Sequence, residues 1–514
     1  MGFLEDRDLS SEQSIPEYYK GKTVFITGGS GFIGKILLEK LLYACTDLDR
    51  IYLLLRSKKG VKSENRLEHF YSLPCFDRLR KEKPNVFNEK VFVVSGDVSE
   101  EGLGLSREDR TLLVNKVNVV FHVAASVRFD DPLTYAAKLN LQGTKEMIDL
   151  AKEIKDLSVF VHVSTSYSNT NRATIEEVMY PAHAEWRDTL DICRQLPEHT
   201  LRTLTPKFLG QLPNTYTFTK QLAEHVVYEE KGRLPIVMIR PSIVISSLEE
   251  PVVGWIENFN GPAGIMVACG KGIMRSIHTK ADLVADFIPV DVCAKHMISA
   301  SWIRGVTPLS PTDDIEIYNC ASGNIQQIVM ADLVQLAKDT AEEVPLNYPL
   351  WSIGGSVTTN ETLHYFRVIF QHLLPAVLVD MLLWMLGKKP LLVKVQRRIY
   401  TANIALKYYL NQHWSFANDN FVALRSKIKP EDMKQFHFNI EDFDINEFMK
   451  KCCWGGRRYL LKEKDEDVPK AKAYLKKTVY RLARYTMLLG NTCNVSISIP
   501  LRLHSDSIAM LLKL

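Results

Sequence analysis

The chain has 514 residues, which exceeds the usual size of one domain, so we expect two domains or one domain with a long appendage. Its net charge of +4 is close to balanced and gives no case for a nucleic-acid partner. The nine cysteines are scattered without a CxxC pair, which excludes a disulfide framework and indicates a reducing compartment. The first residues, MGFLEDRDLSSEQ, are too polar and acidic for a secretory signal.

A glycine-rich turn follows the first predicted strand, which covers residues 22–27. The turn reads TGGSGFIG at 27–34 and leads into an amphipathic helix pattern. Strand, glycine turn and helix in this order place a pyrophosphate at a helix N-terminus. Gly28 permits the tight turn, Gly31 leaves room for the phosphates, and Gly34 lets the helix pack closely on its strand. The residues expected to bind a dinucleotide here are Thr27, Gly28, Ser30, Gly31, Phe32, Ile33 and Gly34.

Apolar runs and helical periodicity alternate from residue 20 to about residue 245. This alternation predicts parallel strands joined by right-handed crossovers, which is an α/β fold with a doubly wound sheet of the Rossmann type. Residues 168–212 break the pattern and are expected to form a surface excursion, and residues 245–345 to close over the sheet as a substrate lid. The predicted strands are 22–27, 50–56, 91–95, 117–123, 158–164 and 235–240, and the main helices between them are 34–44, 63–82 and 136–154.

The second predicted strand ends in Arg56, and Lys58 and Lys59 follow it. An acidic residue at this position would bind the ribose 2′-hydroxyl of NAD, whereas a guanidinium can pair with the 2′-phosphate of NADP. The sequence therefore predicts NADPH as the cofactor, the alternative being that Arg56 is one more solvated cation. Further residues expected to contact this cofactor are Asp97 and Val98 after the third strand and Ala124 after the fourth.

Tyr216 and Lys220 form a YxxxK pair, which places them one helical turn apart on one helix face. A nearby lysine stabilises tyrosinate and would lower the pKa of the phenol, so that Tyr216 can donate a proton to an oxyanion formed by hydride transfer. Tyr18 and Lys22 share this spacing but precede the first strand. Tyr216 follows the fifth strand, where the carboxyl edge of the sheet meets the cofactor, so we select Tyr216 and Lys220 as catalytic residues.

Three hydroxyl side chains, Ser164, Thr165 and Ser166, stand at the end of the fifth predicted strand. One of them is expected to share the oxyanion with the catalytic tyrosine. The strand end reads HVST and is similar to that of sugar-nucleotide dehydratases, which use its threonine. This resemblance favours Thr165 as the third catalytic residue.

The order of these motifs, with Arg240-Pro241-Ser242 after the sixth strand, resembles an extended short-chain dehydrogenase/reductase. The segments VFHVAASVRFDDPL, PNTYTFTKQLAE, GKGIMRS and DFIPVD are similar to segments of the alcohol-forming fatty acyl-CoA reductases. The stretch from His413 to Glu463 resembles the C-terminal domain of that family. It departs from the family at Asp444-Ile445-Asn446, where an aspartate–tryptophan pair is often found.

The resemblance implies that a long-chain acyl-CoA and two NADPH give a primary fatty alcohol, free CoA and two NADP. Thr165 and Tyr216 would stabilise the developing oxyanion, and Lys220 would orient the nicotinamide ribose. Pro241 and Ile243 would seat the carboxamide of the nicotinamide. No metal is expected in this chemistry.

The CoA phosphates need cations, and two candidates lie beside a glycine pair in the expected lid. These are Lys271 and Arg275, and a solvated basic loop is the alternative interpretation. Two other functions also stay open at this point. One is a sterol dehydrogenase or sugar-nucleotide epimerase of the same fold, and the other is a non-catalytic NADP-binding scaffold.

Composition shifts predict an NADP-binding reductase domain with its lid at 1–350, a helical C-terminal domain at 351–465 and a basic amphipathic tail at 466–514. The apolar stretch 368–387 carries polar interruptions, which favour a buried or membrane-surface helix pair over a membrane span. Basic and aromatic residues interleave in the tail, which is typical of a helix on an anionic membrane, the alternative being a solvated helix face.

These features predict two partners, an acyl-CoA substrate and the surface of an intracellular membrane, with the catalytic domain in the cytosol. The last three residues, 512–514, resemble a peroxisomal address only in part, so the peroxisomal membrane and the endoplasmic reticulum both stay open. The sequence leaves the oligomeric state open as well.

Overall fold

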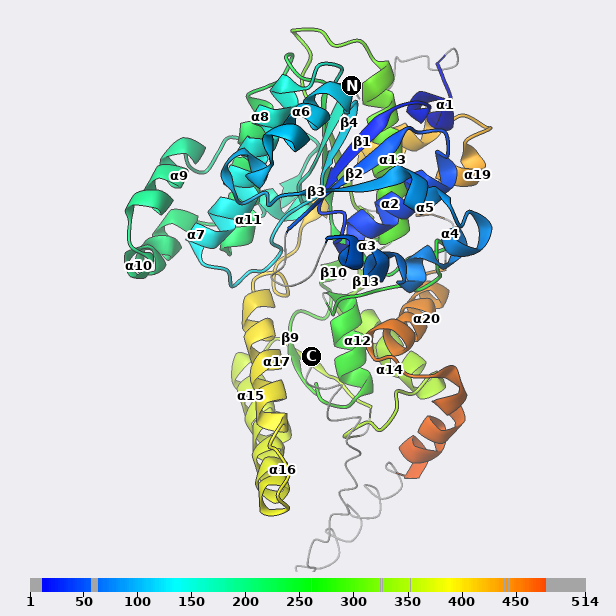
Figure 1. The fold of residues 1–514 in the computed structure, drawn as a ribbon. Coiled ribbons are helices and arrows are strands. Elements are labelled where there is room, and N and C mark those ends of the chain that lie inside the picture. The colour runs from blue at the N-terminus through cyan, green and yellow to red at the C-terminus, as the bar shows by residue number, and fades with distance from the viewer. Residues whose placement is uncertain are drawn as a thin grey trace, which may run out of the picture. The chain divides into compact units, whose positions relative to one another are not determined.

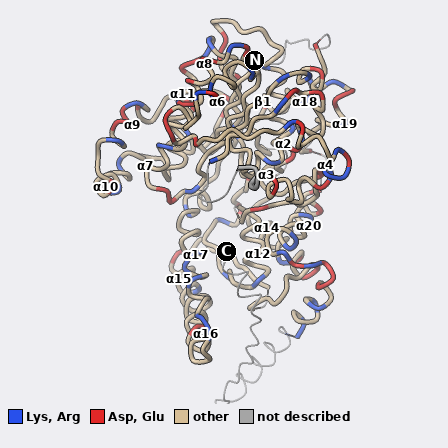
Figure 2. Tube along the Cα trace, viewed as in Figure 1, with Lys and Arg blue, Asp and Glu red and all other residues tan. Residues whose placement is uncertain are grey.

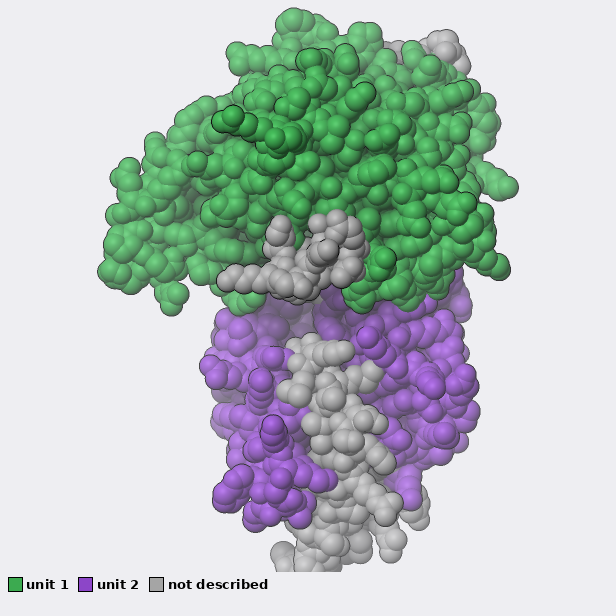
Figure 3. Space-filling view, viewed as in Figure 1, with its two compact units in different colours: residues 1–252, 286–326, 414–442 green, residues 253–285, 327–413, 443–514 purple. Residues whose placement is uncertain are grey.

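The computed structural model of the protein describes residues 12–56, 63–259, 261–323, 325, 327–351, 353–438, 440–441 and 444–477. Lys58, Lys59 and the part of the predicted tail after residue 477 lie outside the described residues. The chain divides into two compact units, which Figure 3 colours separately. Unit 1 consists of 1–252, 286–326 and 414–442, and unit 2 of 253–285, 327–413 and 443–514.

Unit 1 contains a seven-stranded sheet with the order β12-β7-β5-β4-β1-β2-β3 (Figure 1). Neighbouring strands are parallel throughout. This order is that of a doubly wound sheet, so the predicted fold class is confirmed. The strands are β1 (Thr23–Thr27), β2 (Arg50–Leu55), β3 (Val91–Ser95), β4 (Val119–His122), β5 (Val159–Val163), β7 (Ile236–Pro241) and β12 (Glu316–Cys320).

Helices cover both faces of this sheet, which explains why its central strands are apolar along their whole length. β1, β5 and β7 are buried at every position. In Figure 1 the large helices of this unit lie on opposite sides of the strands. One group is α2 (Phe32–Ala44) with α13 (Val290–Val306), and the other is α6 (Arg107–Lys116), α8 (Gly143–Glu153) and α11 (Thr215–Tyr228).

Several elements differ from the sequence-based expectation. The helix expected at 63–82 is interrupted before Pro74, because proline cannot continue an α-helix, and forms α3 (Ser63–Tyr71) and α4 (Asp77–Glu82). The helix expected at 136–154 begins as α7 (Leu133–Ala136) and passes through a π-helical turn, η3 (Ala137–Gln142), before α8. The excursion at 168–212 carries the helices α9 (Trp186–Gln195) and α10 (Glu198–Leu209).

The expectation of a lid over the whole of 245–345 is wrong for residues 286–326. This stretch belongs to unit 1, where β8 (Ile243–Ile245) pairs with β11 (Phe287–Pro289) and β12 forms an edge of the main sheet. α13 is buried from Val290 to Arg304 against α2. An apolar helix that packs on the sheet and an apolar lid have similar composition, so the sequence did not separate them.

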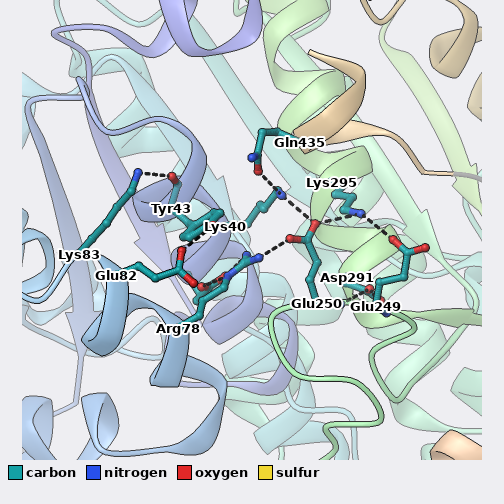
Figure 4. Close-up of polar contacts among 11 residues, drawn as sticks. Lys40, Tyr43, Arg78, Glu82, Lys83, Glu249, Glu250, Asp291, Lys295 and Gln435 are labelled. Atoms are coloured by element: carbon teal, nitrogen blue, oxygen red, sulfur yellow. Dashed lines mark hydrogen bonds and ion pairs between the residues drawn. The ribbon is translucent and has the colours of Figure 1, made fainter. Parts of the chain in front are cut away.

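Charged side chains hold α2 to its neighbours in unit 1 (Figure 4). Glu250 forms ion pairs with Lys40 of α2 at 2.7 Å, Arg78 of α4 at 2.6 Å and Lys295 of α13 at 2.9 Å. Although burial opposes its ionisation, these three cations lower the pKa of Glu250 to about 2. Asp291 accepts hydrogen bonds from the backbone of the same segment, including Glu250 N–H at 3.1 Å. The helix that begins at the glycine turn is therefore anchored near its far end.

Unit 2 is mainly helical, with two short strand pairs, β9 (Ile277–His278) with β14 (Val357–Thr358) and β10 (Val284–Ala285) with β13 (Ile328–Val329). Among the described residues, the helical segment Glu361–Met385 is long and apolar enough to cross a membrane. The main helices of unit 2 are α12 (Pro262–Gly270), α14 (Met330–Glu343), α15 (Glu361–Arg367), η5 (Val368–Leu373), α16 (Leu374–Met385), α17 (Leu392–Leu406) and α20 (Ile445–Gly455).

Candidate active site

The glycine turn between β1 and α2 has the close approaches that a nucleotide-binding turn requires. Gly28 has φ +72°, and a Cβ there would lie 2.6 Å from the backbone nitrogen of Ala124. A Cβ on Gly34 would lie 2.3 Å from the carbonyl oxygen of Gly28. Gly31 is exposed immediately before the first residue of α2. The turn therefore leaves backbone N–H groups and the helix N-terminus open to an anion, as a pyrophosphate needs.

The other residues of the turn have different surroundings. Ser30 is exposed, and Phe32 and Ile33 are half-buried at the start of α2. Thr27 is fully buried, and its hydroxyl lies 2.8 Å from Nδ1 of His122. Thr27 therefore ties β1 to β4 through its side chain, while Ser30 presents its side chain to solvent.

Thr165, Tyr216 and Lys220 come together at the carboxyl edge of the sheet. Thr165 follows β5, its hydroxyl donates to the carbonyl oxygen of Pro241 at 3.4 Å, and it lies near enough to the phenol of Tyr216 to lower the pKa of that group. Tyr216 and Lys220 belong to α11, whose N-cap Asn214 accepts the N–H of Thr217 at 3.0 Å. The predicted catalytic residues therefore share one place, on rigid elements.

The electrostatics of the pair differ from the expectation that Lys220 lowers the pKa of Tyr216. Although Tyr216 keeps some contact with solvent, it lies deep in the protein, and burial raises its pKa to about 12 against the opposing effect of Thr165. Lys220 donates a hydrogen bond to the carbonyl oxygen of Val163 at 2.7 Å, and burial lowers its pKa to about 8. The phenol therefore stays protonated at neutral pH.

A buried ion pair that sequence reasoning missed lies next to Lys220. Glu224, one helical turn further along α11, pairs with Arg240 of β7 at 2.8 Å, and both side chains are at most 1% exposed. Glu224 also accepts hydrogen bonds from Ser164 at 2.5 Å and Ser168 at 2.9 Å, on both sides of Thr165. Its carboxylate raises the pKa of Lys220 against the effect of burial. The signal was an arginine inside an apolar strand, because a buried cation needs an acidic partner.

Asn140 in the π-helical turn η3 connects the loop after β4 to α11. Its side chain accepts the N–H of Ser126 at 2.8 Å and donates to the hydroxyl of Thr219 at 3.1 Å. The same loop carries Phe129, whose ring centroid lies 5.9 Å from that of Tyr216. The sequence alone gave no role to Asn140 or Phe129.

The residues expected around the adenosine and nicotinamide ends also belong to unit 1. Arg56 Nε lies 3.9 Å from Asp97 Oδ2, and the Arg56 side chain is 64% exposed at the edge of the sheet. Ala124 is half-buried directly across from Gly28, and Val98 contacts Gly143. The remaining two residues are Pro241, which ends β7, and Ile243, which begins β8.

Lys271 and Arg275 belong to unit 2. The ammonium group of Lys271 is bound to Glu463 at 2.7 Å and to the carbonyl oxygen of Asn347 at 2.6 Å. Arg275 is half-buried, and its backbone N–H donates to His372. The ammonium group of Lys271 is thus already paired within unit 2. A role of Lys271 and Arg275 in binding the CoA phosphates stays a prediction.

Comparisons with known proteins agree with this arrangement. Two family models, both described as male sterility protein, match residues 26–297 and 371–463. Fatty acyl-CoA reductase 1 of Gallus gallus is 38% identical over 90% of this chain and 89% of its own length, and the Homo sapiens protein of that name is 37% identical over the same shares.

A solved structure shares the fold at low identity. The reductase domain of a nonribosomal peptide synthetase from Mycobacterium tuberculosis superposes with a TM-score of 0.56 at 17% identity, covering 86% of this chain and 95% of that domain. With the nucleotide turn and the Thr165–Tyr216–Lys220 site in place, and with relatives aligned over nine-tenths of its length, the chain belongs to the fatty acyl-CoA reductase family.

Proposed function

We propose that this protein reduces long-chain acyl-CoA thioesters to primary alcohols with NADPH and releases CoA. The observation that carries the proposal is the meeting of Thr165, at the end of β5, with Tyr216 and Lys220 of α11 at the carboxyl edge of the sheet. The nucleotide turn begins at the same edge. The relatives named fatty acyl-CoA reductases support the choice of substrate class.

The residues divide the work in the following way. A nicotinamide cofactor, when bound, supplies the hydride for each of the two reductions. The hydroxyls of Thr165 and Tyr216 stabilise the negative charge that develops on the carbonyl oxygen, first of the thioester and then of the aldehyde. In the first reduction this charge expels the CoA thiolate. In the second, Tyr216 donates the proton of its Oη to the alkoxide, and Lys220 supplies a positive charge beside it.

We propose NADPH over NADH because of Arg56. Its guanidinium stands where the second strand ends, within 3.9 Å of Asp97, and the side chain reaches solvent, where a 2′-phosphate can approach it. The acidic residue that would bind a free 2′-hydroxyl is not at this strand end, since Leu55 and Arg56 occupy it.

We further propose that the protein works at an intracellular membrane, in the peroxisome or the endoplasmic reticulum, with its catalytic unit in the cytosol. A substrate with a long acyl chain and an insoluble product favour a site next to lipid. Imaging of a tagged full-length chain beside markers of both organelles tests this. Uniform cytosolic signal would contradict the proposal.

Turnover of purified protein decides between this function and the alternatives. NADPH oxidation is followed with palmitoyl-CoA, a sterol and a UDP-sugar, and gas chromatography identifies the product. We expect hexadecanol from palmitoyl-CoA alone. Activity only on the sterol or the sugar nucleotide would support another reductase of this fold, and NADPH binding without turnover of any substrate would support a scaffold.

A further inference from the structure

Two helical segments of unit 2 form an antiparallel hairpin, which we define as residues 361–406. The first segment runs through α15, η5 and α16, the second is α17, and the chain reverses at Gly387 with φ +69°. Lys407 Nζ, directly after the hairpin, pairs with Glu361 at 2.7 Å. At the opposite end, Asp380 accepts the backbone N–H groups of Leu391 and Leu392 at 2.8 and 2.9 Å. The two segments are therefore paired along their length.

The first segment of the hairpin exposes a continuous apolar face. Its exposed side chains recur every three or four positions along the helix, and among them Phe370 is 60%, Leu378 54% and Trp384 72% exposed. Isolated exposed apolar residues are normal on a protein surface, but a row of this length marks an interaction site. The exposed residues are Leu363, Tyr365, Phe366, Ile369, Phe370, Leu373, Leu374, Val377, Leu378, Met381, Trp384, Met385 and Leu386.

Gln371 of this stretch is exposed, but its other strongly polar side chains point away from the apolar face, toward the rest of unit 2 or toward α17. His372 is 4% exposed and accepts the N–H of Arg275 at 3.0 Å. Asp380 is 7% exposed because its carboxylate caps the first turn of α17. Arg367 is half-buried and donates to the hydroxyl of Ser356 at 2.9 Å. The single carboxylate between residues 362 and 406 is thus removed from the apolar face.

Exposed cations gather at the end of the hairpin where the chain reverses. Lys388 and Lys389 form the turn, and Lys394, Arg397 and Arg398 follow in the first two turns of α17. In Figure 2 the rest of the α15–α16 segment is largely tan. An apolar face beside a cluster of cations is complementary to a bilayer whose surface carries anionic headgroups, because such a surface attracts each basic side chain that lies near it.

The same cations argue against a hairpin that crosses the bilayer. The segment Glu361–Met385 has 25 residues and a length of about 37 Å, enough for a hydrocarbon core of about 30 Å. A crossing would, however, carry α17 into the hydrocarbon beside α16, with three cations in its first two turns. Charges at that depth are costly and are rarely found facing lipid.

We propose that the hairpin is a monotopic membrane anchor, which lies in the headgroup–acyl boundary of an anionic bilayer with its apolar face toward the lipid tails. The inference deepens the proposed membrane partner and moves it from the basic tail to a defined element. A second copy that packed through the same hairpin would bring the same cations and, because Asp380 is buried, no exposed carboxylate from residues 362–406, and the tail is itself basic. An anionic bilayer offers both partners, since its acyl chains contact the apolar face and its headgroup phosphates pair with the cations.

Vesicle flotation of the purified full chain tests this proposal. Vesicles of phosphatidylcholine alone and with 30% phosphatidylserine are compared for the wild type and for L378E/M381E, which places two charges on the apolar face. We expect binding to anionic vesicles to fall at least tenfold in this variant. The matched control is L204E/L309E, whose targets are 37% and 38% exposed in unit 1, and it should bind as the wild type does. Removing the cations with K388A/K389A should weaken binding to the anionic vesicles only.

Other occupants of the apolar face give different results. If deletion of residues 478–514 abolishes flotation while L378E/M381E still binds, the tail is the anchor and the proposal is overturned. If L378E/M381E converts a dimer into a monomer without affecting flotation, the face binds a second copy and the proposal is overturned. NADPH oxidation with palmitoyl-CoA in detergent solution, without vesicles, should be unchanged in L378E/M381E. Loss of flotation with intact turnover therefore separates failure of the anchor from failure of the proposed reaction.

Discussion

Lys220 is a buried cation with a carboxylate one helical turn away. Burial lowers its pKa to about 8, and Glu224 opposes that shift. Glu224→Gln removes the opposing charge, so the pKa of Lys220 falls. The alkaline limb of kcat/KM, which requires protonated Lys220, should then move to lower pH. A pH–rate profile checks this.

Two controls accompany the Glu224 variant. Ser168→Ala removes one hydrogen bond to the carboxylate but no charge, and should leave the limb in place. Glu224→Asp keeps the charge and should restore most of the profile. A limb that stays where it is in Glu224→Gln, or moves to higher pH, would show that the carboxylate does not set the protonation of Lys220.

The chain offers an internal control for the catalytic tyrosine. Tyr216→Phe removes the proton donor, so we expect turnover of palmitoyl-CoA to fall by about 10²–10⁴-fold while NADPH binding is retained. Tyr18→Phe changes the other tyrosine of a YxxxK pair, which belongs to α1 (Ile15–Tyr19) and contacts Lys22 at 4.7 Å from its ring centre. The Tyr18→Phe variant should reduce palmitoyl-CoA at the rate of the wild type. Equal loss in both variants would count against the proton-donor role.

Cofactor preference can be tested on a single strand. Arg56→Ala should weaken NADPH binding more than NADH binding, measured by fluorescence titration of each, because only NADPH carries a 2′-phosphate for the guanidinium to bind. Arg50 begins the same strand and also lies 3.9 Å from a carboxylate, that of Asp49, so Arg50→Ala is a matched control that should affect neither cofactor. An equal loss for both cofactors in Arg56→Ala would exclude phosphate recognition.

The positions of Thr165, Tyr216 and Lys220 at the sheet edge could be predicted from the sequence, because their spacing and the strand order fix them there. Their catalytic roles stay a prediction. Their protonation could not be predicted. The sequence predicted a lowered pKa for Tyr216 from the proximity of Lys220, whereas the structure gives a raised one, since burial of the phenol outweighs the opposing effect of Thr165. How deeply the phenol of Tyr216 is buried depends on residues that are distant in the sequence. One of them is Phe129, whose ring packs near that of Tyr216.

At the scale of elements, the close packing of α2 against the glycine turn after β1 depends on the absence of a side chain at Gly34. Gly34→Ala would place a Cβ 2.3 Å from the carbonyl oxygen of Gly28. The turn must shift, so we expect a loss of about 1–3 kcal/mol in stability and weaker NADPH binding. Thermal unfolding with and without NADPH measures both. Gly456→Ala, where the nearest atom is a side-chain carbon at 3.4 Å, should change neither.

Strands and the nucleotide turn were predictable because apolar runs of the parallel sheet are bounded by strong turn residues. Helix ends and helix interruptions were harder to predict from the sequence. Pro74 gave a local signal for the interruption between α3 and α4, but nothing local marks the π-helical turn η3, which depends on the partners of Asn140. The interior of the hairpin was also hidden, since only the fold shows that Asp380 caps α17.

The whole molecule is assembled from segments that are far apart in the sequence. Residues 414–442 complete unit 1, where β15 (Ser415–Phe416) pairs with β6 (Thr174–Ile175). In the same stretch Phe421 is 1% and Leu424 0% exposed. Local composition does not show that a late segment packs into a unit formed mainly by earlier residues. Composition alone therefore predicts consecutive domains.

A fragment of residues 1–350 should therefore fail to fold independently, because it lacks the last segment of unit 1. Expressed alone, it should be insoluble or should unfold without a cooperative transition, whereas a chain ending at residue 477 should keep the unfolding temperature of the full chain. Differential scanning calorimetry compares the two. A cooperative transition of the short fragment at the full-chain temperature would contradict this dependence.

The π-helical turn η3 makes the middle of the chain sensitive to its own length. An α-helix advances about 100° per residue, and η3 holds one residue more than a regular turn. Deleting a single amino acid between 137 and 142 would restore regular winding but swing everything upstream around the axis relative to α8. Asn140 could then no longer reach both Ser126 and Thr219. Length variation in this stretch should thus be absent from active relatives, even where the side chains differ.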